Sequence, residues 1–201
     1  RSSSIDHATA RAWSMSVCAR VLARCQTMPS IWTLGHDQPV LASAGQLPIN
    51  QQVQQQNQWC WVASGLTIAQ YHGKGAGVSQ NDFCDLAHGY PRGTRCPNQP
   101  GQLQDDQQAF RALGMSVGRV TSPPSFQTVA SEINAGRPIE TGIYWNAGGG
   151  HAQVIYGYDN QQTLYYGDPW PSSPRYSQMS YSEYVYNYEF QWGEALYGAG
   201  A

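Results

Sequence analysis

Three residues far apart in the chain have the types that nucleophilic catalysis requires: Cys60, His151 and Asp168. A cysteine thiolate attacks a carbonyl carbon, and it is activated when a histidine accepts its proton and a carboxylate orients the imidazole. The order of these residues therefore predicts acyl transfer through a thiol nucleophile. The alternative for Cys60 by itself is a buried, inert cysteine packed between aromatic side chains.

The residues around Cys60 favour the reactive interpretation. Trp59 and Trp61 flank the cysteine, and a helix is expected to begin there and to end at Gly73, because apolar residues recur at helical spacing: Val62, Ala63, Leu66 and Ala69. The partial positive charge of a helix N-terminus favours a thiolate, and a nearby imidazolium does the same.

His151 and Asp168 are expected to meet across a hairpin. His151 directly follows three glycines, 148–150, and begins an apolar strand, whereas Asp168 follows the next strand. The alternatives are a strand-edge histidine bonded to the backbone and an Asp-Pro turn. Asp159 is a further carboxylate nearby, but its setting is typical of the hairpin turn itself.

Gln54, six residues before Cys60, is the candidate oxyanion donor. Acyl transfer needs hydrogen-bond donors directed at the developing oxyanion, and a side-chain amide with the Cys60 backbone N–H would supply them. Because Gln54 lies in a glutamine run, Gln55 is a close competitor.

The elements that must position these residues are predicted from the spacing of apolar residues, which changes along the chain from a helical repeat to the two-residue repeat of strands. After the helix at Cys60, the pattern predicts helices over 79–90, 105–113 and 125–134, then strands over 139–145, 151–158 and 163–166. The Tyr-rich tail adds another strand or a short helix. Helices followed by an antiparallel sheet predict an α+β fold. We read the adjacent Asp105 and Asp106 as a solvated helix face.

Composition excludes several functions. The 201 residues suit one catalytic domain with an appended segment; 41% are hydrophobic, only 12% are charged and the formal net charge is −2. With a single lysine, Lys74, no basic face is available for nucleic acid. No apolar run is long enough to span a membrane. The spacings typical of zinc sites and phosphate loops are absent, so we expect no metal and no cofactor.

Five cysteines leave one odd thiol if the others pair. Cys84 and Cys96 flank a loop that a disulfide would staple, whereas Cys18 and Cys25 would lie about 10 Å apart on a continuous helix, too far for a bridge without an intervening turn. If both pairs form, Cys60 is the free thiol. The alternative is a reduced chain with buried cysteines. Low lysine content and several cysteines favour an exported protein.

The N-terminal region differs from the rest of the chain. A short amphipathic helix is expected over 10–25, followed by an irregular stretch with three prolines. We interpret residues 1–47 as an N-terminal extension or pro-segment and 48–201 as the catalytic domain. The alternative is an ordinary first helix and loop of the same domain.

Taken together, these motifs resemble the bacterial papain-like cysteine peptidases, in particular the secreted and effector-type branch and the related bacteriocin-processing peptidases. The resemblance covers residues 48–170 and rests on Gln54, the Trp59–Ser64 run and two later motifs, Gly150-His151-Ala152-Gln153-Val154 and Gly167-Asp168-Pro169-Trp170. It implies a two-lobed fold, with Cys60 at a helix start in the N-terminal helical half and His151 and Asp168 in the antiparallel sheet half. It also favours the Cys84–Cys96 disulfide. Papain itself has an amide where this chain has Asp168, and related bacterial branches have Asp.

The resemblance implies a secreted cysteine endopeptidase, an extracellular protein that could itself be delivered to another cell. We expect a monomer that acts on a protein or peptide substrate, with a pro-segment as a possible intramolecular partner. Two alternatives use the same fold: a transglutaminase-like acyltransferase with the same triad, and an inactive papain-fold binding module.

Overall fold

The computed structural model of the chain describes residues 44–201. The helix predicted over 10–25, with Cys18 and Cys25, lies outside the described residues.

Three helices form the half of the molecule that carries Cys60: α1 (Cys60–Tyr71), α2 (Gln80–Ala87) and α3 (Leu103–Ala112). They confirm the predicted helices there. A capping box starts α2, because the Ser79 hydroxyl accepts from the Asp82 N–H and the Asp82 carboxylate accepts from the Ser79 N–H. Helix α2 ends at Ala87, earlier than predicted, since Gly89 has a φ of 70° and cannot continue a helix.

The other half is built on a seven-stranded antiparallel sheet with the order β2-β7-β3-β4-β5-β6, and β1 pairs with β4. The predicted strands are β3 (Ile139–Trp145), β4 (Gly150–Tyr158) and β5 (Thr163–Gly167). The tail forms β6 (Tyr176–Ser180), helix α5 (Tyr181–Val185) and β7 (Phe190–Gly200). Helix α4 (Phe126–Asn134) confirms the fourth predicted helix.

Two strands were not predicted, β1 (Gly45–Gln46) and β2 (Ser116–Thr121). In β2 the alternation is broken by Gly118, whose φ of 63° and close approach to the backbone of Tyr197 leave no room for a side chain. The short β1 lies in the stretch interpreted as the extension and pairs with Gly157 and Tyr158 of β4.

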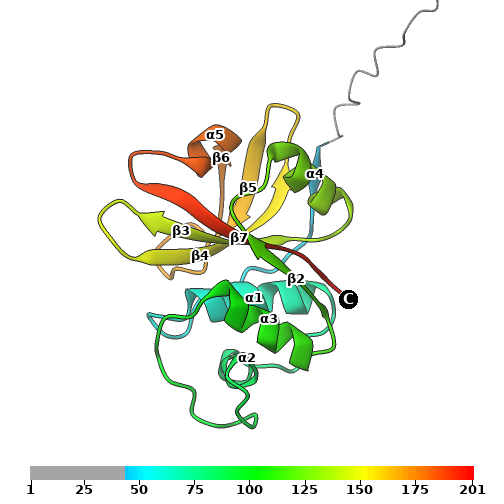
Figure 1. Cartoon of the computed structure of the whole chain (residues 1–201), viewed down its shortest axis with the longest axis vertical. Coiled ribbons are helices and arrows are strands. Elements are labelled where there is room, and N and C mark those ends of the chain that lie inside the picture. The colour runs from blue at the N-terminus through cyan, green and yellow to red at the C-terminus, as the bar shows by residue number, and fades with distance from the viewer. Residues whose placement is uncertain (1–43) are drawn as a thin grey trace, which may run out of the picture. The chain divides into compact units, whose positions relative to one another are not determined.

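The two faces of the sheet bury separate apolar clusters. Helices α1 to α3 cover one face, and α4 and α5 lie on the other (Figure 1). Strand β4 serves both clusters because its side chains alternate, with Val154 in the helical cluster and Ile155 in the other. The result is an α+β fold in which β4 packs directly against α1.

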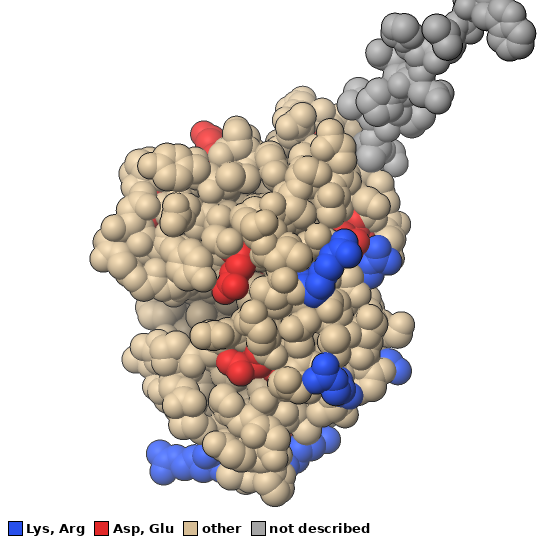
Figure 2. Space-filling view, in the orientation of Figure 1, with Lys and Arg blue, Asp and Glu red and all other residues tan. Residues whose placement is uncertain are grey.

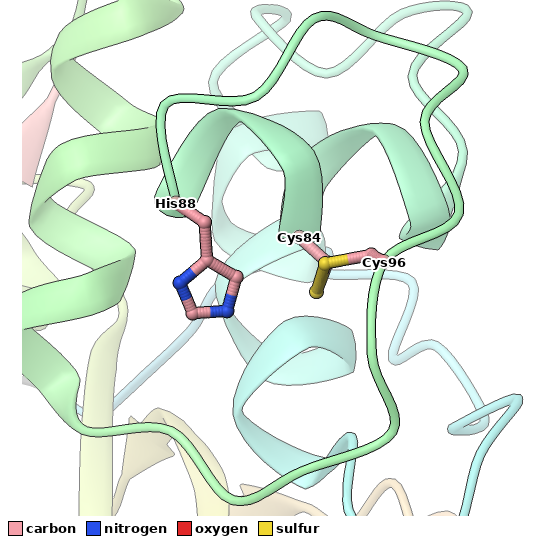
Figure 3. Close-up of side chains that lie close together, drawn as sticks. All are labelled: Cys84, His88 and Cys96. Carbon is pink, nitrogen blue, oxygen red and sulfur yellow. A yellow bond between two sulfur atoms is a disulfide. The ribbon is translucent and has the colours of Figure 1, made fainter.

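A disulfide joins Cys84 of α2 to Cys96, with Cα atoms 6.0 Å apart, and it confirms the expected pairing (Figure 3). Cys60 is a free thiol. Within residues 44–201, none of the helices has the length and apolar character needed to cross a membrane.

Candidate active site

Cys60 is the first residue of α1, and the two flanking tryptophans fix that helix start. Trp59 and Trp61 are buried, and their indole N–H groups donate to the carbonyls of Pro97 and Gln99 at 3.1 and 3.2 Å. Cys60 itself is partly exposed. No side chain caps α1, so the first-turn N–H groups, which have no partner within a helix, remain available at the cysteine. The thiol therefore lies where a helix N-terminus favours negative charge.

His151 lies on β4, with a side chain only 7% exposed. Its Nε2 lies 2.8 Å from Oδ1 of Asp168, and the ring stacks on Trp145 at a centroid distance of 6.0 Å. The preceding turn depends on Gly148 and Gly149, whose φ values of 98° and 90° are unfavourable for other residues. The structure thus brings His151 and Asp168 together across the β4–β5 hairpin.

The pKa values of this pair shift in opposite directions. Burial by itself lowers the pKa of His151, but hydrogen bonds and charge interactions with Asp168 and Cys60 outweigh burial and raise the pKa to about 9. Burial by itself raises the pKa of Asp168, but the hydrogen bond and charge of His151, with donors at Trp170 and Gln153, hold that pKa below its ordinary value. Both shifts favour an imidazolium next to a carboxylate. Cys60 also contributes to the raised pKa of His151, so the thiol, the imidazole and the carboxylate interact electrostatically.

A series of buried hydrogen bonds, which the sequence analysis did not predict, fixes the position of Asp168. The side-chain amide of Gln153 donates to Oδ2 of Asp168 at 2.8 Å, and its Oε1 accepts from the Tyr184 hydroxyl at 2.8 Å. The Tyr184 hydroxyl lies 2.8 Å from Oγ1 of Thr141. The available signal was the strand period, because Gln153 is two residues from His151 and shares its face of β4.

A cleft of about 910 Å³ opens beside these residues. Cys60 and the α3 residue Asp105 line it from the helical half, whereas Trp145, His151 and Glu194 line it from the sheet. Figure 2 shows a hollow between these halves at the left of the molecule. Among the described residues, no Lys or Arg lines the cleft. The nucleophile candidate and its histidine therefore face one space large enough for several residues of a peptide.

Gln54 lies beside the site, whereas Gln55 does not. Gln54 is buried, and its backbone N–H donates to the Pro169 carbonyl at 2.9 Å, next to Asp168. Its side-chain nitrogen donates to the Gln56 carbonyl at 2.8 Å, which uses one of two amide hydrogens. The side chain of Gln55 is exposed.

The interpretation of the two adjacent acids is wrong for one of them. Asp105 caps α3, where it accepts from the Gln102 N–H at 2.8 Å, but Asp106 is completely buried. It occupies space that Gly65 of α1 leaves open, since a Cβ at Gly65 would collide with the Asp106 carboxylate. A helical pattern read from the sequence could not show that gap.

Asp106 has a second buried acid as a neighbour, Glu140 of β3. Burial raises the pKa of Asp106 well above its ordinary value, and the charge of Glu140 raises it further. Burial raises the pKa of Glu140 too, and the charge of Cys60 adds to that effect. No carboxylate oxygen of this pair has a hydrogen-bond partner within residues 44–201. Two buried carboxyl groups, whose burial favours the neutral form, therefore lie near the thiol.

Comparisons with known proteins agree with the predicted fold. A family model described as papain-like cysteine protease AvrRpt2 matches residues 42–189. A double glycine motif protease from an AMS/PCAT transporter, solved in complex with a leader peptide, has 14% identity and a TM-score of 0.52, over 78% of this chain and 95% of that chain. A C39-like peptidase from Bacillus anthracis has 16% identity and a TM-score of 0.53, over 77% and 97%. The search of curated proteins found no match.

Proposed function

Since the chain belongs to the papain-like cysteine protease family of AvrRpt2 and is a cysteine-type peptidase, we propose that Cys60, His151 and Asp168 form its catalytic triad. One observation carries this proposal: His151 bonds to Asp168 through Nε2 and lines the same cleft as Cys60. Because Nε2 is occupied, Nδ1 is the ring nitrogen that can exchange a proton with the thiol.

The reaction follows from these positions. His151 takes the thiol proton, and the Cys60 sulfur attacks the scissile carbonyl carbon to form a tetrahedral intermediate. When the intermediate collapses, the C–N bond breaks, and the imidazolium gives its proton to the leaving amine. The thioester that remains is hydrolysed by a water molecule, from which His151 removes a proton. The carboxylate of Asp168 orients the ring and stabilises the imidazolium throughout.

Oxyanion stabilisation is assigned to Gln54 and the Cys60 backbone N–H. Gln54 is buried beside the Asp168 loop and keeps one amide hydrogen free of the Gln56 carbonyl, whereas Gln55 is exposed. These differences favour Gln54 over its competitor. Each such donor contributes about 2.7–4 kcal/mol to transition-state stabilisation.

The substrate is proposed to be a protein or peptide that lies along the cleft, cut as by an endopeptidase. The size of the cleft supports this, as does the structurally similar double glycine motif protease, which was solved with a leader peptide. We also propose that the protein is bacterial, that it is secreted and that it acts as a monomer; the Cys84–Cys96 disulfide supports an oxidising compartment.

Residues 1–47 are proposed to be an extension or pro-segment, and 48–201 the catalytic domain. A truncation that tests inhibition by this segment should keep residues 44–47, because β1 pairs with β4. Removal of residues 1–43 should raise the rate of peptide hydrolysis if the segment occludes the cleft.

Labelling of Cys60 tests the triad. At mildly acidic pH an ordinary thiol is mostly protonated, so iodoacetamide or a cysteine-directed epoxide should react with Cys60 far faster than with other thiols. Mass spectrometry locates the label, and His151→Ala should slow the reaction. An equal labelling rate in His151→Ala and the unmodified protein would contradict the assignment of His151.

Peptide hydrolysis then tests the reaction itself. Cys60→Ser should remove hydrolysis of a mixed peptide library, and product masses should show new termini rather than conjugates with added amines. Conjugates would indicate the acyltransferase alternative. Unchanged hydrolysis in Cys60→Ser would exclude Cys60 as the nucleophile.

A further inference from the structure

Cys84, His88 and Cys96 form a second cluster of metal-ligating side chains, apart from the proposed triad (Figure 3). One ligand atom from each residue lies within 4.8 Å of the other two. Both cysteines are buried and joined by the disulfide, and His88 is partly buried. Around a tetrahedral zinc ion, sulfur and nitrogen ligands at about 2.3 and 2.0 Å lie roughly 3.5–4 Å apart. The three ligand atoms are therefore near enough to share a zinc ion once the S–S bond is broken and the sulfurs can move apart.

The local fold explains why these residues converge. Cys84 and His88 are four residues apart, and the His88 N–H donates to the Cys84 carbonyl at 3.2 Å, so both side chains lie on one face of the last turn of α2. The loop after α2 then returns Cys96 to the same place. The usual paired zinc spacings are absent from the sequence because the third ligand comes from this returning loop.

His88 brings to the cluster a ring nitrogen that has no partner in the described part of the chain. Its Nε2 is buried, yet it has no hydrogen-bond partner among the described residues. The ring is held by edge contact with Trp61 at a centroid distance of 5.8 Å and by Tyr90 at 5.6 Å. Figure 3 shows a ring nitrogen on the side where the sulfur atoms lie. A buried imidazole nitrogen without a partner is costly, and a bound metal ion would satisfy it.

We propose that reduction of the Cys84–Cys96 disulfide turns this cluster into a binding site for a zinc-like divalent cation. An added phosphine breaks the S–S bond and is oxidised to the phosphine oxide, with water supplying the oxygen, and the two sulfurs become thiols. Zn²⁺ then forms two Zn–S bonds, and the two thiol protons pass to solvent. Neutral His88 donates a nitrogen lone pair as the third ligand, and a water molecule completes the tetrahedron. Thiolate and imidazole ligands select zinc over Mg²⁺ and Ca²⁺.

The site adjoins the helical wall of the cleft. His88 and Trp61 both line the cleft, and the Trp61 indole holds the Gln99 carbonyl just beyond Cys96. A metal ion on Cys84, His88 and Cys96 would therefore hold the same loop that the disulfide holds in the oxidised protein. The chain would keep this wall in place under either redox condition.

Zinc binding by the full chain tests the proposal. In a variant with Cys18→Ser, Cys25→Ser and Cys60→Ser, the only thiols are those of the cluster. Competition with a chromophoric chelator should detect one Zn²⁺ per chain after phosphine reduction and none before it. Co²⁺ should give sulfur-to-metal charge-transfer absorption under the same conditions.

Matched histidine variants identify the third ligand. In the same background, His88→Gln should weaken Zn²⁺ binding by at least about 10-fold, whereas His72→Gln should not. His72 is a suitable control, since it also follows the end of its helix and has a buried, unpartnered Nε2 within the described chain. Circular dichroism of the oxidised proteins checks that both variants fold. Equal zinc affinity in oxidised and reduced protein, or equal effects of the two histidine variants, would overturn the proposal.

Discussion

Oδ1 of Asp168 lies 2.8 Å from Nε2 of His151, so the imidazole is held through one nitrogen, and in the proposed triad the other nitrogen, Nδ1, exchanges a proton with the Cys60 thiol. This contact stabilises the protonated ring, and it is a main reason why the pKa of His151 rises to about 9 despite burial. A thiolate–imidazolium pair is the reactive form of such a site. It exists above the pH at which the thiol loses its proton and below the pH at which the imidazolium does.

Replacement of Asp168 by Asn should move the alkaline limit of activity to lower pH. The amide keeps the shape but removes the charge that stabilises the imidazolium, so the pKa of His151 should fall by about 1 to 3 units. The pH profile of kcat/KM for a peptide substrate measures this shift. Asp168→Asn should retain more activity than Asp168→Ala, because an amide can still accept from the ring. An unchanged alkaline limb in Asp168→Asn would contradict the role given to the carboxylate.

Gln153 should act as a positioning residue through Asp168. Gln153→Leu removes the donor to Oδ2 of Asp168 and leaves the Tyr184 hydroxyl with Thr141 alone. We expect kcat/KM to fall about 10- to 100-fold. The alkaline limit of the pH profile should also move to lower pH, because Asp168 is less well oriented toward His151. Thermal unfolding separates this effect from loss of structure. The exposed Gln191→Leu on β7 is the control and should leave both quantities unchanged.

The order of the proposed triad was predictable because each member lies at the end of an element with a strong local signal. Cys60 starts a helix between two tryptophans, and His151 follows three glycines. The fold class followed from the change of period, which α1 to α4 and β3 to β5 bear out.

What the sequence could not reveal depends on contacts between elements. From the sequence, Asp106 is expected to be solvated because its neighbours are polar. In the structure α1 covers it, since Gly65 has no side chain and leaves room for the Asp106 carboxylate. Strand β2 is interrupted by Gly118, whose conformation depends on pairing with β7. The strand period places Gln153 on the same face as His151, but its role depends on Tyr184 and Asp168 from later in the chain.

The disulfide should stabilise the helical half. Cys84 and Cys96 are 12 residues apart, so removal of the bridge by a double Cys→Ser substitution should lower the free energy of unfolding by about 2–4 kcal/mol. Denaturant unfolding with a metal chelator present measures this difference. A reductant should destabilise the unmodified protein by a similar amount and leave the double variant unaffected. A reductant effect of equal size in both proteins would show that another bond is responsible.

Replacement of Asp106 by Asn should stabilise the protein at alkaline pH. Burial raises the pKa of Asp106 in the folded state above its ordinary value, so the folded protein binds more protons than the unfolded chain, and stability falls as pH rises through that interval. Asn cannot ionise, so this loss disappears. At pH 8 we expect a gain of roughly 1–4 kcal/mol in the free energy of unfolding, and little difference near pH 4.

Denaturant unfolding at pH 4, 6 and 8 measures the slope that distinguishes this effect. Glu140→Gln should act in the same direction, because burial raises the pKa of Glu140 as well. The double variant should gain less than the sum of the single gains, since each acid raises the cost of ionising the other. The exposed Glu189→Gln is the control and should leave the slope unchanged. If Asp106→Asn and the unmodified protein lose stability in parallel between pH 4 and 8, the pKa of Asp106 is not raised in the folded state and the prediction is wrong.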